Sequence, residues 1–324
     1  MVKAIQFHST GGPEVLQWEE VTVGDPGPGE IRVKHTAIGL NYIDTYHRTG
    51  LYPLPLPHGI GMEGAGHVTA IGNGVTDLAV GDRVAYAGPP PGSYAEERLM
   101  AASTAVKIPN SVDDETAAAM MLKGMTAQYL IRQTYPVKAG DTILIHAAAG
   151  GVGQIVCQWA KSLGATVIGT VGNDEKAEMV RALGCDHPIV YTREDFVEKV
   201  MDITAGAKLP VVYDSVGQDT FMKSLDCLQP LGTMVSFGQS SGAVPPLDLG
   251  IFAQKGSLFF TRPTLMTYTA NRADLLAMTD DLFTVVQNGT VKIAIDQRFA
   301  LQDARAAHEA LEGRQTTGST ILLP

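Results

Sequence analysis

Residues 143–154 of the chain read ILIHAAAGGVGQ, an apolar run, a glycine-rich turn and the start of a helix. Bare backbone at Gly150, Gly151 and Gly153 lets a pyrophosphate approach the N–H groups at a helix start. Against the pattern G-x-G-x-x-G, Ala148 replaces the first glycine while Gly150 and Gly153 fit. The alternative is a turn whose glycines serve packing alone. The strand before the turn and the helix after it favour dinucleotide binding.

The sequence around this turn alternates between short apolar and amphipathic stretches. We expect strands at residues 142–145, 166–171, 189–191, 211–215 and 233–237. Helices are expected between them, at residues 152–163, 175–183, 193–204 and 220–228. Alternation with this spacing predicts an α/β fold with a doubly wound parallel sheet and right-handed crossovers.

The N-terminal part of the chain is β-rich instead. Strands are expected at residues 2–7, 30–38, 66–71, 82–87 and 94–100, separated by Gly/Pro turns. Short strands separated by such turns predict a small barrel-like domain. Three prolines make residues 51–58 a rigid extended loop. The tail after Pro263, with helices at 273–288 and 301–312 and a strand at 320–323, is too short for its own fold. We expect it to pack on the N-terminal domain.

Charge and cysteine content exclude several classes of protein. The net charge of −10 disfavours nucleic acid as the main partner and anionic membranes. Three separated cysteines, none in a C-x-x-C, exclude a disulfide framework and a cysteine-rich zinc site. No signal peptide is recognised, and the uncharged stretch at 142–160 is interrupted by His146 and Gln154. We expect a soluble cytoplasmic protein.

The residues after the second expected strand of the sheet bear on the choice of cofactor. An NAD site usually has an acidic side chain about 20 residues beyond the glycines. Here the positions are Thr170, Val171, Gly172 and Asn173, followed by Lys176. A cation suits a 2′-phosphate, so NADPH is favoured over NADH. The alternative is that Lys176 is a solvated helix residue, with Asp174 and Glu175 only capping the helix.

Several motifs together resemble one family. They are GGPEVL at 11–16, IGLNYIDTY at 38–46, the glycine turn, VYDSVG at 212–217, SFGQSSG at 236–242 and TGS at 317–319. Along its whole length the chain resembles the medium-chain dehydrogenases/reductases, specifically the zinc-independent bacterial NADPH:quinone oxidoreductases related to zeta-crystallin. The resemblance implies a GroES-like β-barrel catalytic domain (1–122 and 263–324) around a Rossmann NADPH-binding domain (123–262).

The chain departs from its zinc-dependent relatives at the metal site. The zinc alcohol dehydrogenases that this fold resembles have Cys where Asn41 stands and His-Glu where Met62-Glu63 stands. Asn and Met are poor zinc ligands, and residues 88–97 contain no Cys for a structural zinc lobe. His67 is interpreted as a structural histidine. No metal is predicted, and alcohol oxidation is disfavoured because nothing else would polarise the oxygen.

The resemblance also implies site residues in the cleft between the domains. Those bordering nicotinamide and substrate are Asn41, Tyr46, Tyr52 and Thr126, although each tyrosine is equally interpretable as an ordinary half-buried aromatic. The remaining cofactor contacts implied are Tyr42, Ile43, Asp44, Tyr129, Gly150, Gly151, Val152, Gly172, Asn173, Lys176, Tyr191, Ser215, Phe237, Gly238, Gln239, Ser240, Pro263, Thr264, Leu265 and Arg314. Arg314 has an alternative as a helix C-terminal cation.

The expected activity is NADPH-dependent quinone reduction, because an electrophilic quinone needs positioning more than acid–base catalysis. Reduction of activated C=C bonds in enones or acrylyl thioesters is one alternative. A non-catalytic NADPH-binding sensor or RNA-binding protein is another. The family also implies a homodimer. Residues 257–261 (SLFFT) have the character of an edge strand that pairs across a two-fold axis, or else of a buried strand.

Overall fold

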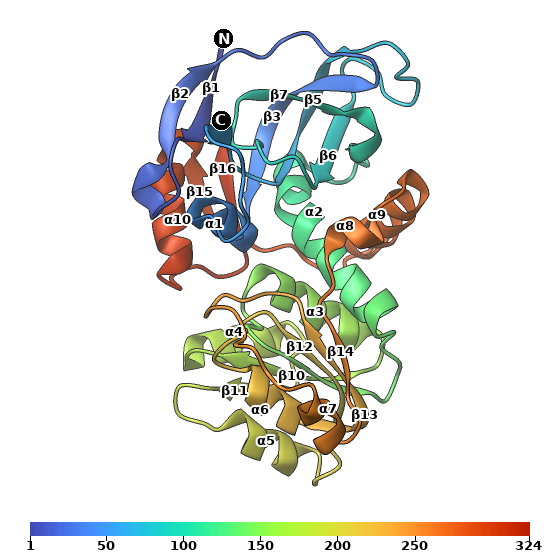
Figure 1. Ribbon diagram of the computed structural model, residues 1–324. Helices are drawn as coiled ribbons and strands as arrows, with labels where there is room; N and C mark the ends of the chain where they lie inside the picture. The colour runs from blue at the N-terminus through green and yellow to red at the C-terminus, as the bar shows by residue number, and fades with distance from the viewer. The chain divides into compact units, whose positions relative to one another are not determined.

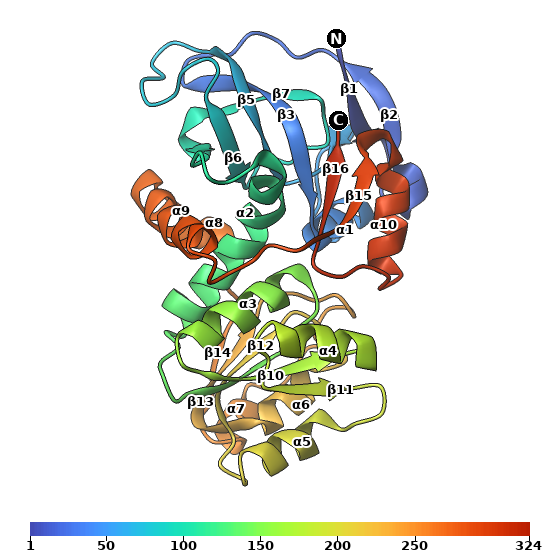
Figure 2. The same ribbon diagram turned by 180° about the vertical axis from the view of Figure 1, so that it is seen from behind.

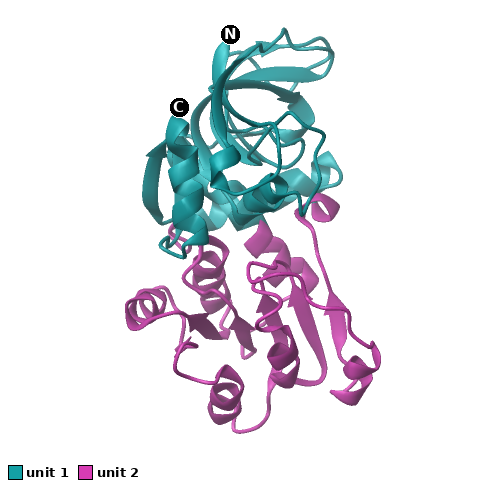
Figure 3. Ribbon diagram, turned by 60° about the vertical axis from the view of Figure 1, so that its left-hand side comes forward, with its two compact units in different colours: residues 1–125, 269–287, 293–324 teal, residues 126–268, 288–292 magenta.

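The structure is a computed structural model that describes residues 1–324. The chain divides into two compact units, coloured separately in Figure 3. Unit 1 comprises Met1–Met125, Thr269–Gln287 and Ile293–Pro324, and unit 2 comprises Thr126–Tyr268 and Asn288–Lys292. The chain therefore crosses between the units several times, and each unit is described by itself below.

Unit 2 contains a six-stranded parallel sheet with the order β11-β10-β9-β12-β13-β14. Its strands are β9 (Thr142–Ile145), β10 (Thr166–Val171), β11 (His187–Val190), β12 (Leu209–Asp214), β13 (Leu228–Ser236) and β14 (Phe259–Thr261). One face carries α3 (Gly151–Ser162) and α4 (Asp174–Ala182) (Figure 2). The other carries α5 (Phe196–Ile203), α6 (Phe221–Asp226) and α7 (Gly250–Gln254) (Figure 1). The predicted doubly wound α/β fold is confirmed.

Two details of unit 2 refine the predictions. The helix predicted to begin at residue 193 begins at Phe196, because Asp195 serves as its N-cap and accepts hydrogen bonds from the N–H groups of Val197 and Glu198. The edge strand predicted at residues 257–261 is present as the shorter β14, which begins at Phe259 and lies at one end of the sheet. The Phe259 and Phe260 side chains there are 60% and 47% exposed. A buried strand is thereby excluded.

Unit 1 is built on a seven-stranded sheet with the order β15-β16-β3-β5-β6-β8, in which β7 also pairs with β3. These strands are β3 (Glu30–Leu40), β5 (Glu63–Ile71), β6 (Arg83–Ala87), β7 (Glu97–Ala101), β8 (Val106–Lys107), β15 (Ile295–Ala300) and β16 (Ser319–Leu323). A smaller sheet of order β2-β1-β4 contains β1 (Val2–Phe7), β2 (Gln17–Val21) and β4 (His58–Gly59). Because β16 pairs antiparallel with β3, the tail does pack on the N-terminal domain, as predicted.

Unit 1 also contains helices from the N-terminal and C-terminal parts of the chain, and the last of them packs beside the N-terminal strand β1. They are α1 (Tyr42–Thr49), α2 (Asp114–Tyr129, which continues into unit 2), α9 (Arg272–Gln287) and α10 (Ala304–Glu312). Ala304 and Ala307 of α10 pack with Ile5, Phe7 and Leu322 in one buried cluster. Helix α10 begins later than predicted because residues 301–303 form a 3-10 turn. No helix has the length and apolarity needed to cross a membrane.

Candidate active site

The predicted cofactor residues of unit 2 follow the carboxyl ends of its strands. The glycine turn follows β9, residues 172–176 follow β10, and Tyr191 follows β11. Ser215 follows β12, residues 237–240 follow β13, and residues 263–265 follow β14. Since all neighbouring pairs in this sheet are parallel, these segments meet at one edge. Ligands of open α/β sheets bind at this edge.

The glycine turn is shaped for close approach by a ligand backbone. Gly150 is the N-cap of α3, and the Gly150 N–H donates to the Ala147 carbonyl at 2.9 Å. A Cβ on Gly153 would lie 2.5 Å from the Ala147 oxygen, so this glycine is required by internal packing. A Cβ on Gly150 would meet only that oxygen, at 3.3 Å. The bare side of Gly150 therefore faces open space beside the first N–H groups of α3, which suits a pyrophosphate.

Two acids, Asp174 and Glu175, follow β10 together with Asn173 and Lys176. The Asn173 side chain caps α4 by accepting from the Lys176 N–H at 2.9 Å. Asp174 forms a two-pronged ion pair with Arg193 and is thereby engaged. The Lys176 side chain begins in the same turn, and a Cβ on Gly172 would lie 3.4 Å from the Tyr191 hydroxyl. This arrangement suits a 2′-phosphate better than a bare ribose 2′-hydroxyl.

The turns after β12 and β13 are held against each other. The buried Asp214 carboxylate accepts from the N–H groups of Val216 at 2.7 Å and Gly217 at 3.1 Å. The Ser240 N–H donates to the Ser215 carbonyl at 3.1 Å, and a Cβ on Gly238 would lie 2.6 Å from that same carbonyl oxygen. Gly238 is therefore needed for the two turns to touch. Together the two turns form a rigid surface at this edge of the sheet.

An aromatic pair lies where α2 enters unit 2. The rings of Tyr129 and Tyr268 stack at 4.5 Å with an interplanar angle of 7°. Burial raises the pKa of Tyr129, and a hydrogen bond with the Thr126 side chain opposes that rise. The Tyr129 hydroxyl thus stays protonated at neutral pH. Sequence reasoning missed Tyr268, which a separation of more than a hundred residues hides from any local pattern.

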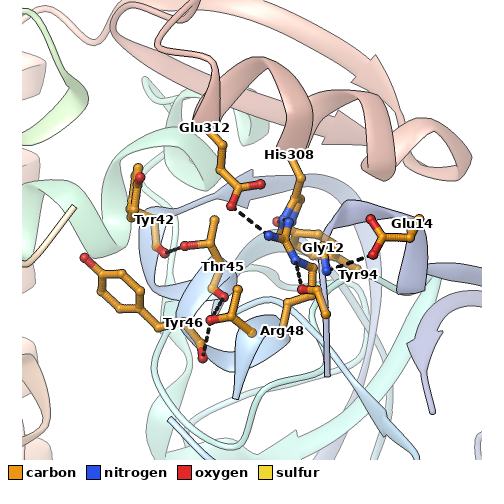
Figure 4. Close-up of polar contacts among 11 residues, drawn as sticks. Gly12, Glu14, Tyr42, Thr45, Tyr46, Arg48, Tyr94, His308 and Glu312 are labelled. Atoms are coloured by element: carbon orange, nitrogen blue, oxygen red, sulfur yellow. Dashed lines mark hydrogen bonds and ion pairs between the residues drawn. The ribbon is translucent and has the colours of Figure 1, made fainter. Parts of the chain in front are cut away.

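In unit 1, the predicted tyrosines form a continuous aromatic array on and beside α1. Tyr42 and Tyr46 meet edge to face with centroids 5.6 Å apart, and Tyr46 meets Tyr52 in the same way at 5.3 Å. All three are partly exposed. Figure 4 shows the Tyr42 and Tyr46 side chains extending from α1 away from Arg48. The array is suited to contacting a flat ring. Arg314 lies close enough to lower the pKa of Tyr42, which burial raises.

Asn41 lies at the start of α1 in a fully bonded environment. Its side-chain amide donates to Glu63 Oε2 at 2.7 Å and to the Gly39 carbonyl at 3.4 Å. Lys123 Nζ lies 3.4 Å from the same Glu63 oxygen and 3.0 Å from the Leu40 carbonyl. An amide that donates to a carboxylate with an ammonium beside it is not a zinc ligand set. The residues present do not fit a zinc ion here, and the structure contains no cluster of His, Cys, Asp or Glu suited to a metal.

A second network, missed by sequence reasoning, fixes the rest of α1, and Figure 4 shows its part around Arg48. The Asp44 carboxylate is completely buried and accepts from the Asn41 N–H and the Tyr94 hydroxyl, both at 2.9 Å. His308 joins Tyr94 at 3.2 Å and Arg48 at 2.9 Å. Arg48 also donates to Glu312 at 2.7 Å and to the Gly11 carbonyl at 3.1 Å. The contact of Asp44 with the cofactor stays a prediction, and its carboxylate is engaged within unit 1.

The ionisation states in this network follow from burial. Burial raises the pKa of Asp44 to about 7 and lowers the pKa of His308 to about 3. Neutral His308 must accept the Arg48 proton at Nδ1, so its Nε2–H donates to the Tyr94 oxygen. The Tyr94 hydroxyl then donates to Asp44. The hydrogen bonds thus run in one direction, from Arg48 to Asp44.

The predicted site residues fall into two groups. Asn41, Tyr42, Ile43, Asp44, Tyr46, Tyr52 and Arg314 belong to unit 1, and all the others belong to unit 2. Within unit 2 the structure brings the predicted turns to one edge of the sheet. Within unit 1 it brings the tyrosines together, and it engages the Asn41 amide and the Asp44 carboxylate internally. His67, interpreted as structural, is half exposed and lies 3.5 Å from Asp114.

Comparisons with known proteins agree along the whole chain. The alcohol dehydrogenase GroES-like domain matches residues 27–110, and the zinc-binding dehydrogenase domain matches residues 151–282. A quinone oxidoreductase of Pseudomonas aeruginosa is 54% identical over 100% of both chains. A 2-haloacrylate reductase of a Burkholderia species is 50% identical over 100% of this chain and 99% of the other.

One of the similar solved structures is a complex with a cofactor. Escherichia coli quinone oxidoreductase complexed with NADPH is 50% identical, with a TM-score of 0.98, over 99% of this chain and 100% of that one. The match therefore includes residues of both units. The chain belongs to the quinone oxidoreductase family of medium-chain dehydrogenases/reductases.

Proposed function

We propose that this chain reduces quinones with NADPH and needs no metal ion to do so. The observation that carries the proposal is the sheet edge of unit 2, which offers a helix start for a pyrophosphate and an Asn173–Lys176 turn for an adenosine phosphate. Its quinone oxidoreductase relatives support the substrate class, and the relative complexed with NADPH supports the cofactor. In this proposal unit 2 binds NADPH and unit 1 is the catalytic domain.

NADPH supplies a hydride from C4 of its nicotinamide when bound. Gly150, Gly151 and Val152 hold the pyrophosphate, and Asn173 with Lys176 holds the adenosine phosphate. Gly172, Tyr191, Ser215, residues 237–240 and residues 263–265 line the dinucleotide, with Arg314 as a phosphate partner. Thr126 and Tyr129 orient the nicotinamide by hydrogen bonding.

The tyrosine array of α1 supplies the surface for the substrate ring. Tyr46 and Tyr52 contact the quinone by stacking or edge contacts, and water provides the protons. Asn41 acts by holding the start of α1, because its amide hydrogens are engaged by Glu63 and Gly39. No side chain is required as an obligatory acid, since a quinone is electrophilic before it is protonated.

The second candidate is reduction of an activated C=C bond. The 2-haloacrylate reductase, 50% identical to this chain, favours it. A haloacrylate carries a carboxylate, which binds best to an unpaired cation. In unit 1 the buried Arg48 and Lys123 are already paired with Glu312 and Glu63, and the α1 array is aromatic. These pairings favour a neutral flat substrate, so we rank quinones first.

The test follows NADPH oxidation at the nicotinamide absorption band with ortho- and para-quinones, enones, haloacrylates and aldehydes, each with and without chelator. Quinone-driven oxidation that resists the chelator is expected. Oxidation by enones or haloacrylates alone would move the function to alkene reduction. Tight NADPH binding with no turnover would contradict both and favour a sensor, and salt-sensitive RNA binding would favour an RNA-binding role.

The cofactor preference has its own prediction. Lys176→Ala should raise the Michaelis constant for NADPH about tenfold, since a charge-assisted bond to the 2′-phosphate is lost. NADH lacks that phosphate, so its constant should stay nearly unchanged. Steady-state kinetics with both cofactors measure the difference, with Lys199→Ala, an exposed α5 lysine, as the control. Equal effects on the two cofactors would contradict the assignment.

We also propose that the chain forms a homodimer through β14. The edge position of this strand and its exposed phenylalanines support pairing with a second copy. Sedimentation velocity of the chain and of Phe260→Lys tests it. A dimer converted to monomer by the substitution is expected, and a monomer at all concentrations would contradict it.

A further inference from the structure

A buried ion pair in unit 1 has no part in the proposed hydride transfer. Glu63 is 0% exposed and Lys123 is 7% exposed. Every polar atom of the pair has partners. Glu63 Oε1 accepts from the Leu122 N–H at 2.8 Å, and Oε2 accepts from Asn41. Burying two charges is costly, and a buried pair often adds no net stability. Its presence therefore calls for a reason other than stability.

The space for the Glu63 carboxylate depends on glycine at position 39. A Cβ on Gly39 would lie 2.3 Å from Glu63 Oε2 and 2.3 Å from the Ala118 carbonyl oxygen. Only glycine lets the carboxylate pack between β3 and α2. In the sequence, Lys123 is a single charge inside the apolar stretch AAAMMLKGM at 117–125. Such a lysine needs a buried counter-ion.

The pair joins elements that carry proposed site residues. Glu63 begins β5, Leu40 ends β3, and Asn41 is the N-cap of α1, which carries Tyr42 and Tyr46. Lys123 lies on α2, one turn before Thr126. The carboxylate thus touches the start of α1 and the backbone of α2 at once. A cation beside Glu63 is what keeps this carboxylate in place.

We propose that Lys123 is a positioning residue whose ammonium group holds the buried Glu63 carboxylate in place. Through Glu63 it fixes the start of α1 against the part of α2 that lies in unit 1, and so fixes the tyrosine array. The inference rests on the proposed function, because its readout is turnover.

The experiment is a double-mutant cycle with Lys123→Met, Glu63→Gln and the variant carrying both, plus Lys123→Arg as the conservative replacement. Each single change leaves one buried charge without its counter-ion, whereas the double variant removes both charges. Lys123→Met should lower kcat for quinone about 10- to 100-fold through misplacement of the array. The double variant and Lys123→Arg should recover most of this loss.

The readouts separate positioning from simple loss of fold. The dissociation constant for NADPH should change less than about twofold, because all proposed phosphate contacts except Arg314 lie on the sheet edge of unit 2. Tm and circular dichroism check folding. The matched control is Lys107→Met, which breaks the surface pair with Asp82, where the N–O distance is 2.9 Å. This control should change neither kcat nor the Michaelis constant.

Several outcomes would overturn the inference. They are unchanged kcat in folded Lys123→Met, a loss confined to NADPH affinity, and a double variant no better than the single ones. If wild type fails with quinones but reduces another acceptor, the proposed function fails and the cycle is run on that acceptor. If wild type reduces no acceptor, the positioning role is refuted together with the proposed function.

Discussion

Two buried carboxylates flank the start of α1, and they are held in different ways. Both Glu63 and Asp44 are 0% exposed, and both bond to Asn41, Glu63 through the side-chain amide and Asp44 through the backbone N–H. Glu63 has the Lys123 ammonium beside it. Asp44 has only the Tyr94 hydroxyl and that N–H, and its Oδ1 has no hydrogen-bond partner.

The partner of a buried acid, rather than burial itself, decides whether that acid anchors a helix or titrates. Burial raises the pKa of Asp44 to about 7 although the hydrogen bonds from Asn41 and Tyr94 and the more distant Lys123 charge oppose the rise, so this group titrates in the physiological range. A carboxylate that bonds to an ammonium, an amide and a backbone N–H is held in one position. Glu63 therefore anchors the start of α1, while Asp44 on the same helix titrates.

Removing the anchor should have the largest effect. Glu63→Leu leaves the Lys123 ammonium buried without a counter-ion and deprives Asn41 of its acceptor. The free energy of unfolding should fall by about 3–5 kcal/mol. Urea denaturation at pH 7 measures this change, with Glu97→Leu on the neighbouring β7 as the control. A loss below about 1 kcal/mol would show that Glu63 is not an anchor.

Asp44→Asn should remove the pH dependence of stability that titration of Asp44 causes. A folded pKa of about 7 lies above the unfolded value, so wild type loses stability as pH rises from about 4 to about 7. The amide resembles the protonated acid and lacks this loss. Between pH 5 and pH 8 the stability of wild type relative to Asp44→Asn should fall by about 3 kcal/mol.

Urea titrations at several pH values measure that trend. Asp82→Asn is the control, because the hydrogen bond from Lys107 holds the pKa of Asp82 below its usual value and the carboxylate stays ionised throughout this range. A difference between wild type and Asp44→Asn that does not change with pH would show that Asp44 is charged in the folded protein.

His308 should give a trend of opposite sign. Burial lowers its pKa to about 3, so wild type loses stability as pH falls below the unfolded value of 6.5. His308→Gln can accept from Arg48 and donate to Tyr94 without titrating. Between pH 6.5 and pH 5 wild type should lose about 2 kcal/mol more than this variant. Parallel curves for the two proteins in urea would indicate that His308 is already protonated.

The smallest effect should come from the tyrosine array beside these networks. Tyr46→Phe keeps the ring contacts with Tyr42 and Tyr52 and removes only a hydroxyl. The variant should keep turnover within about tenfold of wild type, because quinone reduction needs no acid from the protein. Steady-state kinetics decide this point. A loss above roughly a thousandfold would identify Tyr46 as a general acid.

Sequence patterns predicted unit 2 better than unit 1. The bounds of β9 and β10 match the expectation because buried parallel strands are continuous apolar runs. Helix α1 was not predicted, since eight residues with low intrinsic helix preference form it through the Asn41–Asp44 cap and buried partners. The Glu63 contacts join residues 22 and 60 positions apart, and the Arg48–His308 contact spans 260. Local periodicity carries no information about such pairings.

The most direct test of the central claim is a single-turnover reaction of chelator-treated protein with NADPH deuterated at C4 and a quinone. Separate samples carry the label on each face of the nicotinamide. We predict a slower reaction with one of the two labels, and loss of that deuterium from the nicotinamide as deuteride. Equal rates with all samples, or quinone reduction that stops on chelation and returns with added metal, would contradict metal-free hydride transfer.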